Sequence, residues 1–572
     1  MSTMADITSG VLIVGAGPTG LTLALELALL KVPFRIIDKA AVPSDKSRAL
    51  VLQPRSLELL RRHGLDQAMA KRGVAGTGAR IYVYKKPAVT TALGSFGLED
   101  TAFPRPLWLS QADTEGVMAD HLAAVYGVHV ERGITATELA QDADGVDVAL
   151  CRPDGGATER LRCAYAVGCD GAHSAVRHAA GLSFEGAPYP VDFILCDAYL
   201  DWTELASDPE ALTRLMLFLS SQDLVVCFPF KDGLVRLIAN EDPSGKAADT
   251  PPSLADFQAR FDSVAPGRAT LRNPVWLTRF RLHHRIVDSF RRGRLFVAGD
   301  AAHIHSPAGG QGMNTGIQDA INLGWKLARV LALQGSAADG GQTPSAAAAS
   351  IERLLDSYHA ERHPVGLKLL RGTDRLFGYA STRSWWFNLW RNFFVRWILP
   401  VVFSSRRLTA RVFRFGSELA IRYRRSTMSG TAKTFAGPVR GGDRAPDGKV
   451  VSADGLERYL MELCPGDRYH LLLFSGTGQD AVGKDDLETA AKHIGDSAGA
   501  RKLGRMDVHK IYSWASSDSA GVVDVHERVH MTYGFKRAGY VLVRPDTYVA
   551  HIGALASHDQ LAQWLGAQYP TL

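Results

Sequence analysis

The 572-residue sequence has few cysteines, and they are not paired at a spacing typical of metal ligands. No CxxC motif occurs, and no histidines alternate with the cysteines at ligand spacing. This scatter predicts buried free thiols, with no disulfide framework, no metal site and no dithiol chemistry. The six are Cys151, Cys163, Cys169, Cys196, Cys227 and Cys464.

Long apolar runs are also missing. No stretch of about 18 uncharged apolar residues is present, so no transmembrane helix is predicted. Residues 1–9 have no basic region of the kind that opens a signal peptide, and we expect a cytoplasmic protein. The net charge is +6, but no nucleic-acid-binding fold is recognisable, so nucleic acid is not an expected partner. The length predicts two or three domains.

Acidic residues are almost absent from residues 383–425, where ten arginines accompany a single acid, Glu418. The stretch 384–400 also contains four of the ten tryptophans. We expect helices here that pack over a neighbouring domain. Peripheral membrane contact through 384–403 is the alternative, because interfacial helices combine aromatic and basic residues in this way.

A glycine motif near the N-terminus predicts a dinucleotide site. It follows the apolar strand 11–14 and precedes the apolar helical stretch 18–31. Its glycines allow a tight turn, the approach of a pyrophosphate to the backbone, and close packing of helix on strand. An acid ending the next strand can accept hydrogen bonds from a ribose. The predicted contacts are Gly15, Gly17, Pro18, Gly20 and Asp38.

Two later motifs indicate that the dinucleotide is FAD. Residues 169–177 follow a strand and open a helix, with a carboxylate at the turn. The strand 295–298 ends in Gly299-Asp300, where a carboxylate can bind a ribityl hydroxyl, and a glycine-rich loop then leads into a helix near Gly312. That helix N-terminus would stabilise negative charge on a reduced flavin. His303 and His305 are expected to be structural. The predicted contacts are Asp170, Asp300, Pro307, Gly310, Gly312, Met313 and Asn314.

The motifs GAGPTG (15–20), CDGAHSAVR (169–177) and GDAAHIHSPAGGQGMN (299–314) together resemble those of the FAD-dependent aromatic hydroxylases. These are the group A flavoprotein monooxygenases, which include phenol hydroxylase-like and polyketide hydroxylase-like members. The resemblance implies that Arg48 lies by the FAD phosphates and that Gln111 contacts the flavin. Residues 540–550 resemble the thioredoxin-like C-terminal domain of the longer members.

The resemblance implies an α/β protein with a Rossmann-like FAD-binding domain, an inserted antiparallel β-sheet substrate domain and a thioredoxin-like C-terminal domain. A Gly/Pro-rich joint at 437–448 is predicted to be crossed by few contacts. The expected segments are 1–75, 105–182 and 286–380 for FAD, 76–104 and 183–285 for substrate, 381–436 for a helical connection, and 437–572 for the C-terminal domain.

The implied chemistry is reduction of FAD by NADPH or NADH, followed by oxygen transfer from a flavin C4a-hydroperoxide to an aromatic ring. An aromatic acid would require a cation in the pocket. The strands expected at 215–219, 224–230 and 234–239 offer only Arg236, so we favour a neutral phenolic or polyketide-like ring. No catalytic residue is identified; Tyr82, His283 and His284 are candidate bases. The tentative substrate contacts are Met216, Phe218, Val226, Phe228, Arg236 and His283.

Several alternatives stay open. The same flavin chemistry could support epoxidation, Baeyer–Villiger-type oxygen insertion or inactivation of an antibiotic. A protein of another class, an inactive FAD-fold binding protein, would use the C-terminal domain for partners. A flavin halogenase is disfavoured, because the Trp-x-Trp-x-Ile-Pro signature is absent. A homodimer or a monomer is expected.

Overall fold

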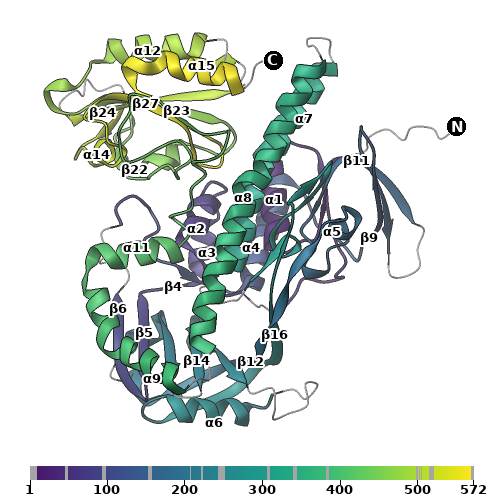
Figure 1. Cartoon of the computed structure of the whole chain (residues 1–572), viewed down its shortest axis with the longest axis vertical. Helices are drawn as coiled ribbons and strands as arrows, with labels where there is room; N and C mark the ends of the chain where they lie inside the picture. The colour runs from purple at the N-terminus through teal and green to yellow at the C-terminus, as the bar shows by residue number, and fades with distance from the viewer. Residues whose placement is uncertain are drawn as a thin grey trace.

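The computed structural model of the chain contains three large sheets and one small one (Figure 1). It describes residues 9–45, 49–92, 98–152, 158–206, 208–220, 223–241, 252–305, 310–338, 344–381, 385–497, 500, 501, 503, 505–514 and 521–568. Each large sheet has eight strands within these ranges; the strands of the first two alternate along the sequence, and the third is built from residues 430–554.

The first sheet has the parallel centre that the glycine motif predicts. Its neighbouring strands β18, β11, β1 and β2 run parallel, so their carboxyl ends meet at one edge. These four strands are β1 (Ser9–Val14), β2 (Phe34–Asp38), β11 (Glu159–Gly168) and β18 (Leu295–Val297). The outer strands are β8 (Glu131–Arg132), β9 (Thr135–Gln141), β10 (Val146–Cys151) and β17 (Arg291–Arg292).

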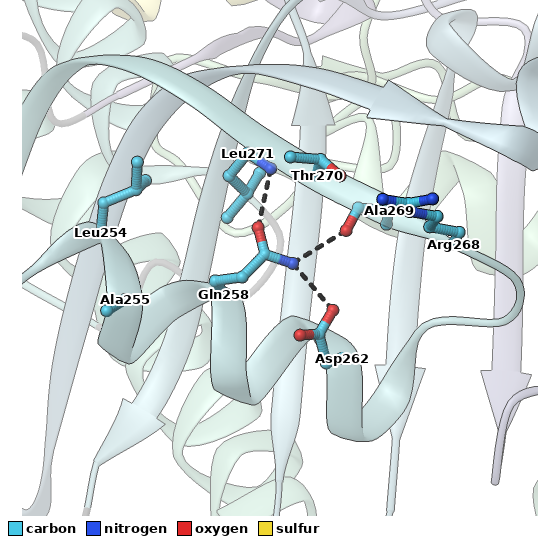
Figure 2. Close-up of a pocket in the computed structure, with 8 residues that line it drawn as sticks. All are labelled: Leu254, Ala255, Gln258, Asp262, Arg268, Ala269, Thr270 and Leu271. Carbon is cyan, nitrogen blue, oxygen red and sulfur yellow. Dashed lines mark hydrogen bonds between the residues drawn. The ribbon is translucent and has the colours of Figure 1, made fainter.

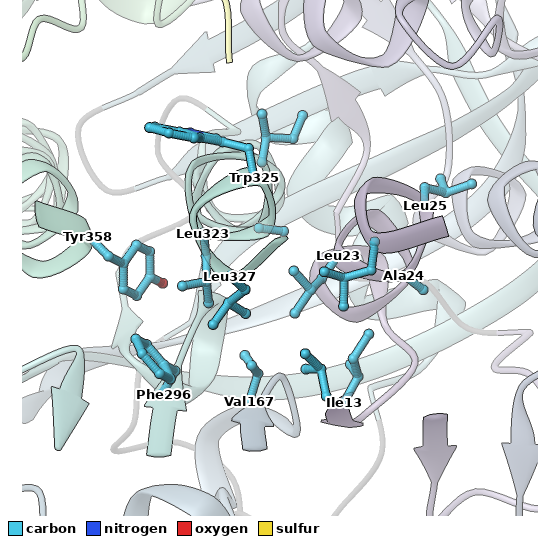
Figure 3. Packing of buried hydrophobic residues seen from close by; sticks show 14 of the residues in the cluster. Ile13, Leu23, Ala24, Leu25, Val167, Phe296, Leu323, Trp325, Leu327 and Tyr358 are labelled. Atoms are coloured by element: carbon cyan, nitrogen blue, oxygen red, sulfur yellow. The ribbon is translucent and has the colours of Figure 1, made fainter. Parts of the chain in front are cut away.

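Helices α1 and α7 pack on one face of this sheet and form the main core. Figure 3 shows Ile13, Val167 and Phe296 of the strands directed toward side chains of both helices. Tyr358 of α8 closes the side of the cluster, and its hydroxyl donates to the Val297 carbonyl at 2.9 Å. The helices of this part are α1 (Pro18–Leu29), α2 (Pro54–Arg61), α3 (Asp66–Arg72), α4 (Gln111–Tyr126), α5 (Ala175–Ala179), α7 (Gly312–Ala338) and α8 (Pro344–Ser381).

The second sheet lies below the first in Figure 1, and α6 (Leu254–Val264) covers its outer face. It is antiparallel except where β13 runs parallel to β5. Its strands are β5 (Gly78–Val83), β6 (Lys86–Ala92), β12 (Phe184–Trp202), β13 (Arg214–Leu219), β14 (Leu224–Pro229), β15 (Leu234–Glu241), β16 (Ala269–Val287) and β19 (His303–Ile304). A small sheet of β3 (Val51–Leu52), β4 (Val74–Ala75) and β7 (Leu107–Trp108) lies between it and the first.

The third sheet belongs to the C-terminal part, where α12 and α15 lie along one side (Figure 1). Its centre pairs β23 with β24 in parallel and with β26 in antiparallel orientation. The elements are β20 (Gly430–Thr431), β21 (Lys449–Val451), β22 (Glu457–Tyr459), β23 (Tyr469–Gly476), α12 (Lys484–Asp496), β24 (Met506–Ser513), β25 (Val522–Asp524), α14 (Arg528–Tyr533), β26 (Arg537–Val543), β27 (Val549–Ala554) and α15 (His558–Gln568).

The Gly/Pro-rich joint is not the sparsely contacted linker that we expected. Residues 441–448 are all buried, and Arg444 donates to Glu58 at 2.8 Å and also pairs with Asp100. Asp447 accepts from Arg61 at 2.8 Å. Glycine and proline here allow the chain to pack closely, and the acid–base pairs replace the water that a linker would have kept.

The connecting segment forms α9 (Trp385–Phe393), a short π-helix (Phe394–Ile398), α10 (Leu399–Ser404) and α11 (Arg406–Gly416). The segment packs over the second sheet, because Val395 and Leu399 join one apolar cluster with Val83 and Leu219. Most of its large apolar side chains are nevertheless exposed. We call the exposed side chains the aromatic–arginine surface: Trp386, Leu389, Trp390, Phe393, Phe394, Trp397, Ile398, Val401, Leu408, Val412 and Phe415, with Arg396, Arg406, Arg407 and Arg411 among them. Among the described residues, no helix combines the length and apolar character needed to cross a bilayer.

Candidate active site

The three predicted motifs meet at the carboxyl ends of β1, β11 and β18. Gly15 has a φ of +102°, and a Cβ atom there would lie 2.4 Å from the Cys169 carbonyl oxygen. Gly299 has a φ of +59°, and its Cβ would lie 2.4 Å from Thr19 Oγ1 in the first motif. Both positions therefore require glycine, for conformation and for space. The first motif contacts both of the others directly.

Open space lies in front of Gly17. A Cβ at this position would meet only Glu115 Oε1, at 4.0 Å, so a ligand can approach the backbone where α1 begins. The first amides of a helix lack intrahelical partners and favour an anion. Pro18 is at the start of the helix, where it costs no hydrogen bond. These features fit the pyrophosphate of a dinucleotide.

Glu115 is a site residue that the sequence did not reveal. Its Oε1 accepts from Gln111 Nε2 at 2.8 Å, and burial raises the pKa of its carboxyl, with the Asp38 charge adding to the effect. Protonation of Glu115 would remove a negative charge from the position where the pyrophosphate is expected. The Gln111 amide donates to the Ala49 carbonyl at 3.0 Å. Arg48 lies outside the described residues.

Asp38 holds the glycine turn in place. Its Oδ2 accepts from the Ala16 amide at 2.7 Å and its Oδ1 from the Ala40 amide at 2.8 Å. A carboxylate oxygen can accept more than one bond, so these contacts leave capacity for a ribose hydroxyl. Ribose binding by Asp38 stays a prediction.

Asp170 has an unsatisfied acceptor at the centre of the site. Its Oδ2 accepts from the Ala175 amide at 2.7 Å, while the buried Oδ1 has no partner. Burial raises the pKa of this carboxyl. An unsatisfied buried oxygen is costly, and a ligand hydroxyl or amide would relieve the cost. Arg177 joins this motif to the third by donating to the carbonyls of Ala172 and Ala301, at 2.7 and 3.2 Å.

Asp319 on α7 binds residues of the third motif, and the sequence motifs did not identify it. Its Oδ2 accepts from the Gly299 amide at 3.0 Å and from His303 Nε2 at 2.8 Å. Its Oδ1 accepts from Arg362 at 2.7 Å. The available signal was an acid within the apolar stretch of α7, since a buried acid must have partners. The structural role expected of His303 stays a prediction.

The side chain of Asn314 joins the segment before α2 to Gly310. Its amide nitrogen donates to the carbonyls of Val51 and Gly310, both at 2.8 Å, and its oxygen accepts from the Gln53 amide at 2.8 Å. These bonds use both hydrogens of the side-chain amide, and FAD binding by Asn314 stays a prediction. Gly312 and Met313 begin α7, and Asp300 is exposed at the end of the strand. Pro307 lies outside the described residues.

The predicted substrate contacts divide between the two faces of the second sheet. Val226 and Phe228 lie half-buried on the face turned toward the flavin motifs, where Phe228 packs with Trp108 and Leu215. Met216 and Phe218 lie instead in the core beneath α6, fully buried. Their assignment as substrate contacts is therefore wrong, because β13 presents its odd-numbered residues to the flavin side.

Tyr82 and Arg236 are also occupied elsewhere. Tyr82 stacks on Phe218 at 4.9 Å in the same core, and burial raises its pKa, so it does not serve as a base. Arg236 is buried and donates to both oxygens of Asp197 at 2.6 Å, so its charge is already neutralised within the sheet. Its tentative assignment as a substrate contact is corrected. His283 and His284 lie half-buried on β16 and stay candidates.

A surface hollow between α6 and β16 is not part of this site. Figure 2 shows Gln258 at its centre, bonded to Asp262, Ala269 and Leu271 at 2.7 to 2.8 Å. Its eight lining residues come from α6 and from the segment that begins β16, and none belongs to the three motifs. Because its central polar group is satisfied internally, the hollow offers a ligand little.

Comparison with known proteins agrees with this geometry. Residues 8–373 match the family model described as an FAD binding domain, and residues 498–569 match that of the phenol hydroxylase C-terminal dimerisation domain. The chain belongs to the FAD-dependent aromatic hydroxylase family. It is therefore a flavin-dependent aromatic monooxygenase that binds FAD, and NADH or NADPH is the reductant typical of this family. The family therefore excludes the alternative that the chain is an inactive FAD-fold binding protein.

Individual relatives cover from about two thirds to nearly the whole of the chain. The chain is 32% identical to 6-methylpretetramide 4-monooxygenase of Streptomyces rimosus over 560 residues, which is 97% of this chain and 93% of that one. It is 37% identical to rifampicin monooxygenase of Streptomyces venezuelae over 382 residues, 65% and 72% of the two chains. A solved anhydrotetracycline hydroxylase from Streptomyces rimosus matches with a TM-score of 0.70 and 28% identity, covering 98% of each chain.

Proposed function

We propose that this monooxygenase hydroxylates a neutral phenolic or polyketide-like ring system and does not act on a small aromatic acid. The observation that carries the proposal is the neutralised charge of Arg236, which Asp197 binds through both oxygens. A substrate carboxylate buried beside an already paired arginine would lack a counter-ion, at a cost of several kcal/mol. The substrates named for the three relatives support the same class.

The proposed position of the substrate ring follows from the contacts of Gly310, at the end of the glycine-rich loop that precedes α7. A Cβ at Gly310 would lie 3.1 Å from Val51, and Val51 packs in one cluster with Trp108, Phe228 and Leu215. This cluster joins the end of the loop to the half-buried face of the second sheet. An apolar ring held there is shielded from water.

The residues of the chain hold and orient the reactants. The amides at Gly17, with Asp38 and Asp170, would hold FAD, while Asp319 and Asn314 fix the two ends of the glycine-rich loop. Bound FAD supplies electron transfer from NAD(P)H and activation of O2. His284 packs edge-on against Tyr189 at 5.0 Å, and its buried Nδ1 has no hydrogen-bond partner. It is the better-placed of the two histidines to take the phenolic proton.

Matched substrates test the charge argument. We would measure NAD(P)H oxidation with polycyclic phenols and with the same ring systems bearing a carboxylate, and analyse products by mass spectrometry. The neutral compounds should accelerate NAD(P)H oxidation at least about tenfold more than the acids and gain one oxygen atom. A preference for the acids would contradict the substrate class and leave the family assignment intact. Epoxidation, Baeyer–Villiger oxygen insertion and antibiotic inactivation are distinguished by the product structures.

We also propose that the protein is a homodimer, because it contains a segment matching a dimerisation domain. Light scattering coupled to size-exclusion chromatography measures the mass in solution directly. A mass of about twice 62.0 kDa is expected, and a mass of one chain at micromolar concentration would contradict the dimer.

Six free thiols in the described chain agree with a reducing, cytoplasmic compartment.

The aromatic–arginine surface supports peripheral binding to an anionic lipid surface. Eleven large apolar side chains are exposed there, four exposed arginines lie among them, and residues 386–417 contain no acid. Positive charge disfavours pairing of this surface with its own copy and favours anionic headgroups. The surface lies on α9 to α11, at the lower left of Figure 1 and away from the C-terminal sheet.

Flotation with liposomes tests this contact. Wild-type protein should float with vesicles that contain anionic lipid and stay at the bottom with neutral ones. Trp390→Ser should lower the floating fraction several-fold, because an interfacial tryptophan is lost. Trp514→Ser is the matched control, since both side chains are 67% exposed but Trp514 lies in the C-terminal part. Equal flotation of both variants, or none of the wild type, would contradict the proposal.

A further inference from the structure

The C-terminal sheet brings together three metal-binding side chains that the flavin chemistry does not use. Cys464 follows the short helix Leu460–Leu463, His470 lies on β23 and His509 on β24. These two strands pair in parallel, with His470 opposite Asp507 and Leu472 opposite His509. Spacings of six and thirty-nine residues gave no ligand signal in the sequence, so the grouping is a product of the fold.

The geometry is close to that of a zinc site. His470 Nδ1 and His509 Nε2 are 3.1 Å apart, and the ligand atoms of all three residues lie within 4.8 Å of one another. Bond lengths of about 2.0 Å to nitrogen and about 2.3 Å to sulfur place tetrahedral ligands roughly 3.3 to 3.5 Å apart. The two nitrogens, at 3.1 Å, are slightly closer than this, and binding requires a small adjustment of both rings and of the cysteine side chain.

The orientation of His470 matches that of a metal ligand. Its Nε2 lies 2.7 Å from the Pro465 carbonyl, which can only accept, so Nε2 carries the proton and donates it there. Nδ1 then accepts a hydrogen bond from His509 Nε2 at 3.1 Å, so metal binding requires the His509 proton to move to the other nitrogen of its ring. Metal-binding histidines commonly donate their second ring nitrogen to a backbone carbonyl in this way. Cys464 and His470 are buried, and His509 is half-buried, which gives solvent access to one side of the group.

We propose that Cys464, His470 and His509 bind a zinc ion, with water as the fourth ligand. Binding releases the thiol proton to solvent, so that a thiolate and two neutral imidazoles coordinate Zn²⁺. The ion would join the end of the short helix to the two strands at the centre of the third sheet.

A second cluster provides a built-in comparison. His493, His558 and Asp559 also approach one another, but the carboxylate is 3.4 Å from one imidazole and 3.7 Å from the other, and His493 and Asp559 are exposed. Without a buried ligand, this group is an ordinary surface ion pair. Any metal bound there must be separated from metal bound at Cys464.

The test measures zinc retained by the FAD-loaded, full-length protein after incubation with Zn²⁺ and dialysis against a chelating resin. We expect about one zinc per chain in the wild type and in His493→Asn, which lacks the surface cluster. Cys464→Ser and His509→Asn should each lose most of it. Cys196→Ser is the matched control, because that thiol is equally buried but lies in the second sheet.

Cobalt gives an independent readout. Co²⁺ added to the same proteins should produce a thiolate-to-metal charge-transfer band in the wild type that is missing from the difference spectrum of Cys464→Ser. Flavin absorbance and circular dichroism establish that each variant is folded, and the half-buried His509→Asn covers the case in which Cys464→Ser is not. Retention below about 0.2 zinc in the wild type, or equal retention in Cys464→Ser, would overturn the proposal.

Discussion

At the scale of single residues, Glu418 is a buried acid that packs beside α7. It is buried, has a φ of +63°, and accepts from Thr315 Oγ1 at 3.0 Å and from Gln318 Nε2 in the first turns of α7. Burial raises the pKa of its carboxyl to about 8. The sequence marked this residue only as the one acid among ten arginines, because its burial depends on how the connecting segment folds back onto α7.

Glu418→Gln tests this assignment through the pH dependence of stability. The folded carboxyl keeps its proton between the ordinary pKa near 4.5 and about pH 8, whereas the unfolded one loses it. The free energy of unfolding therefore falls as pH rises through this window, and glutamine avoids the fall. In urea unfolding, the variant should gain on the order of 2 to 5 kcal/mol relative to wild type between pH 5 and pH 9.

The exposed Glu457→Gln is the control for Glu418→Gln and should show no such change. Gln318 can accommodate the new amide by rotating its own, since its Oε1 has no partner at present. A difference from wild type that stays constant from pH 5 to pH 9 would contradict a raised pKa at Glu418.

A second prediction at this scale concerns Asp300. Replacement by alanine should weaken FAD binding roughly 10- to 100-fold, because a hydrogen bond from a ribityl hydroxyl to a charged group is lost. Fluorescence titration of the apoprotein with FAD measures the change, and the exposed Asp144→Ala is the control. Full flavin affinity in Asp300→Ala would show that the ribityl chain lies elsewhere.

At the scale of elements, the sequence predicted which segments form strands and helices better than it predicted which face each one buries. The strands at 215–219 and 224–230 form as β13 and β14, and the helix expected from Gly312 is α7. The alternation along β13 indicates two faces but does not say that α6, some forty residues later, covers Met216 and Phe218. That pairing is non-local, as is the burial of the joint at 441–448.

The contact of α8 with the C-terminal part gives a prediction for two elements. Arg544 donates to both oxygens of Glu361 on α8, at 2.6 and 2.8 Å, and all of these groups are buried. Arg544→Met leaves a buried carboxylate without its main partner and should cost about 3 to 5 kcal/mol of unfolding free energy. Glu361 keeps Lys326 as a second partner at 2.8 Å, which limits the loss.

The control for Arg544→Met is Arg272→Met, which breaks an exposed pair with Asp201 at 2.7 Å. That variant should lose less than about 1 kcal/mol in the same urea experiment. Comparable losses in the two variants would show that the buried pair does not link α8 to the C-terminal part.

At the scale of the whole molecule, the site depends on segments that the sequence motifs could identify but not assemble. The three motifs predicted FAD, because their glycines and acids have a physical role wherever the strands end. The neutralisation of Arg236 by Asp197 and the flavin-side face of the second sheet depend on pairing between β12 and β15, which only the fold supplies. The proposed substrate class therefore rests mainly on the structure, whereas the family assignment rests on both the sequence and the structure.

The central claim is that this chain transfers one atom of O2 to a neutral aromatic ring. The most direct measurement supplies the purified, FAD-loaded protein with NAD(P)H, a polycyclic phenol and ¹⁸O2, and follows reductant consumption and product mass. We predict accelerated NAD(P)H oxidation and a product that contains a single ¹⁸O atom bonded to the ring. A product whose added oxygen comes from water, or acceleration without any oxygenated product across the phenols tested, would contradict the account.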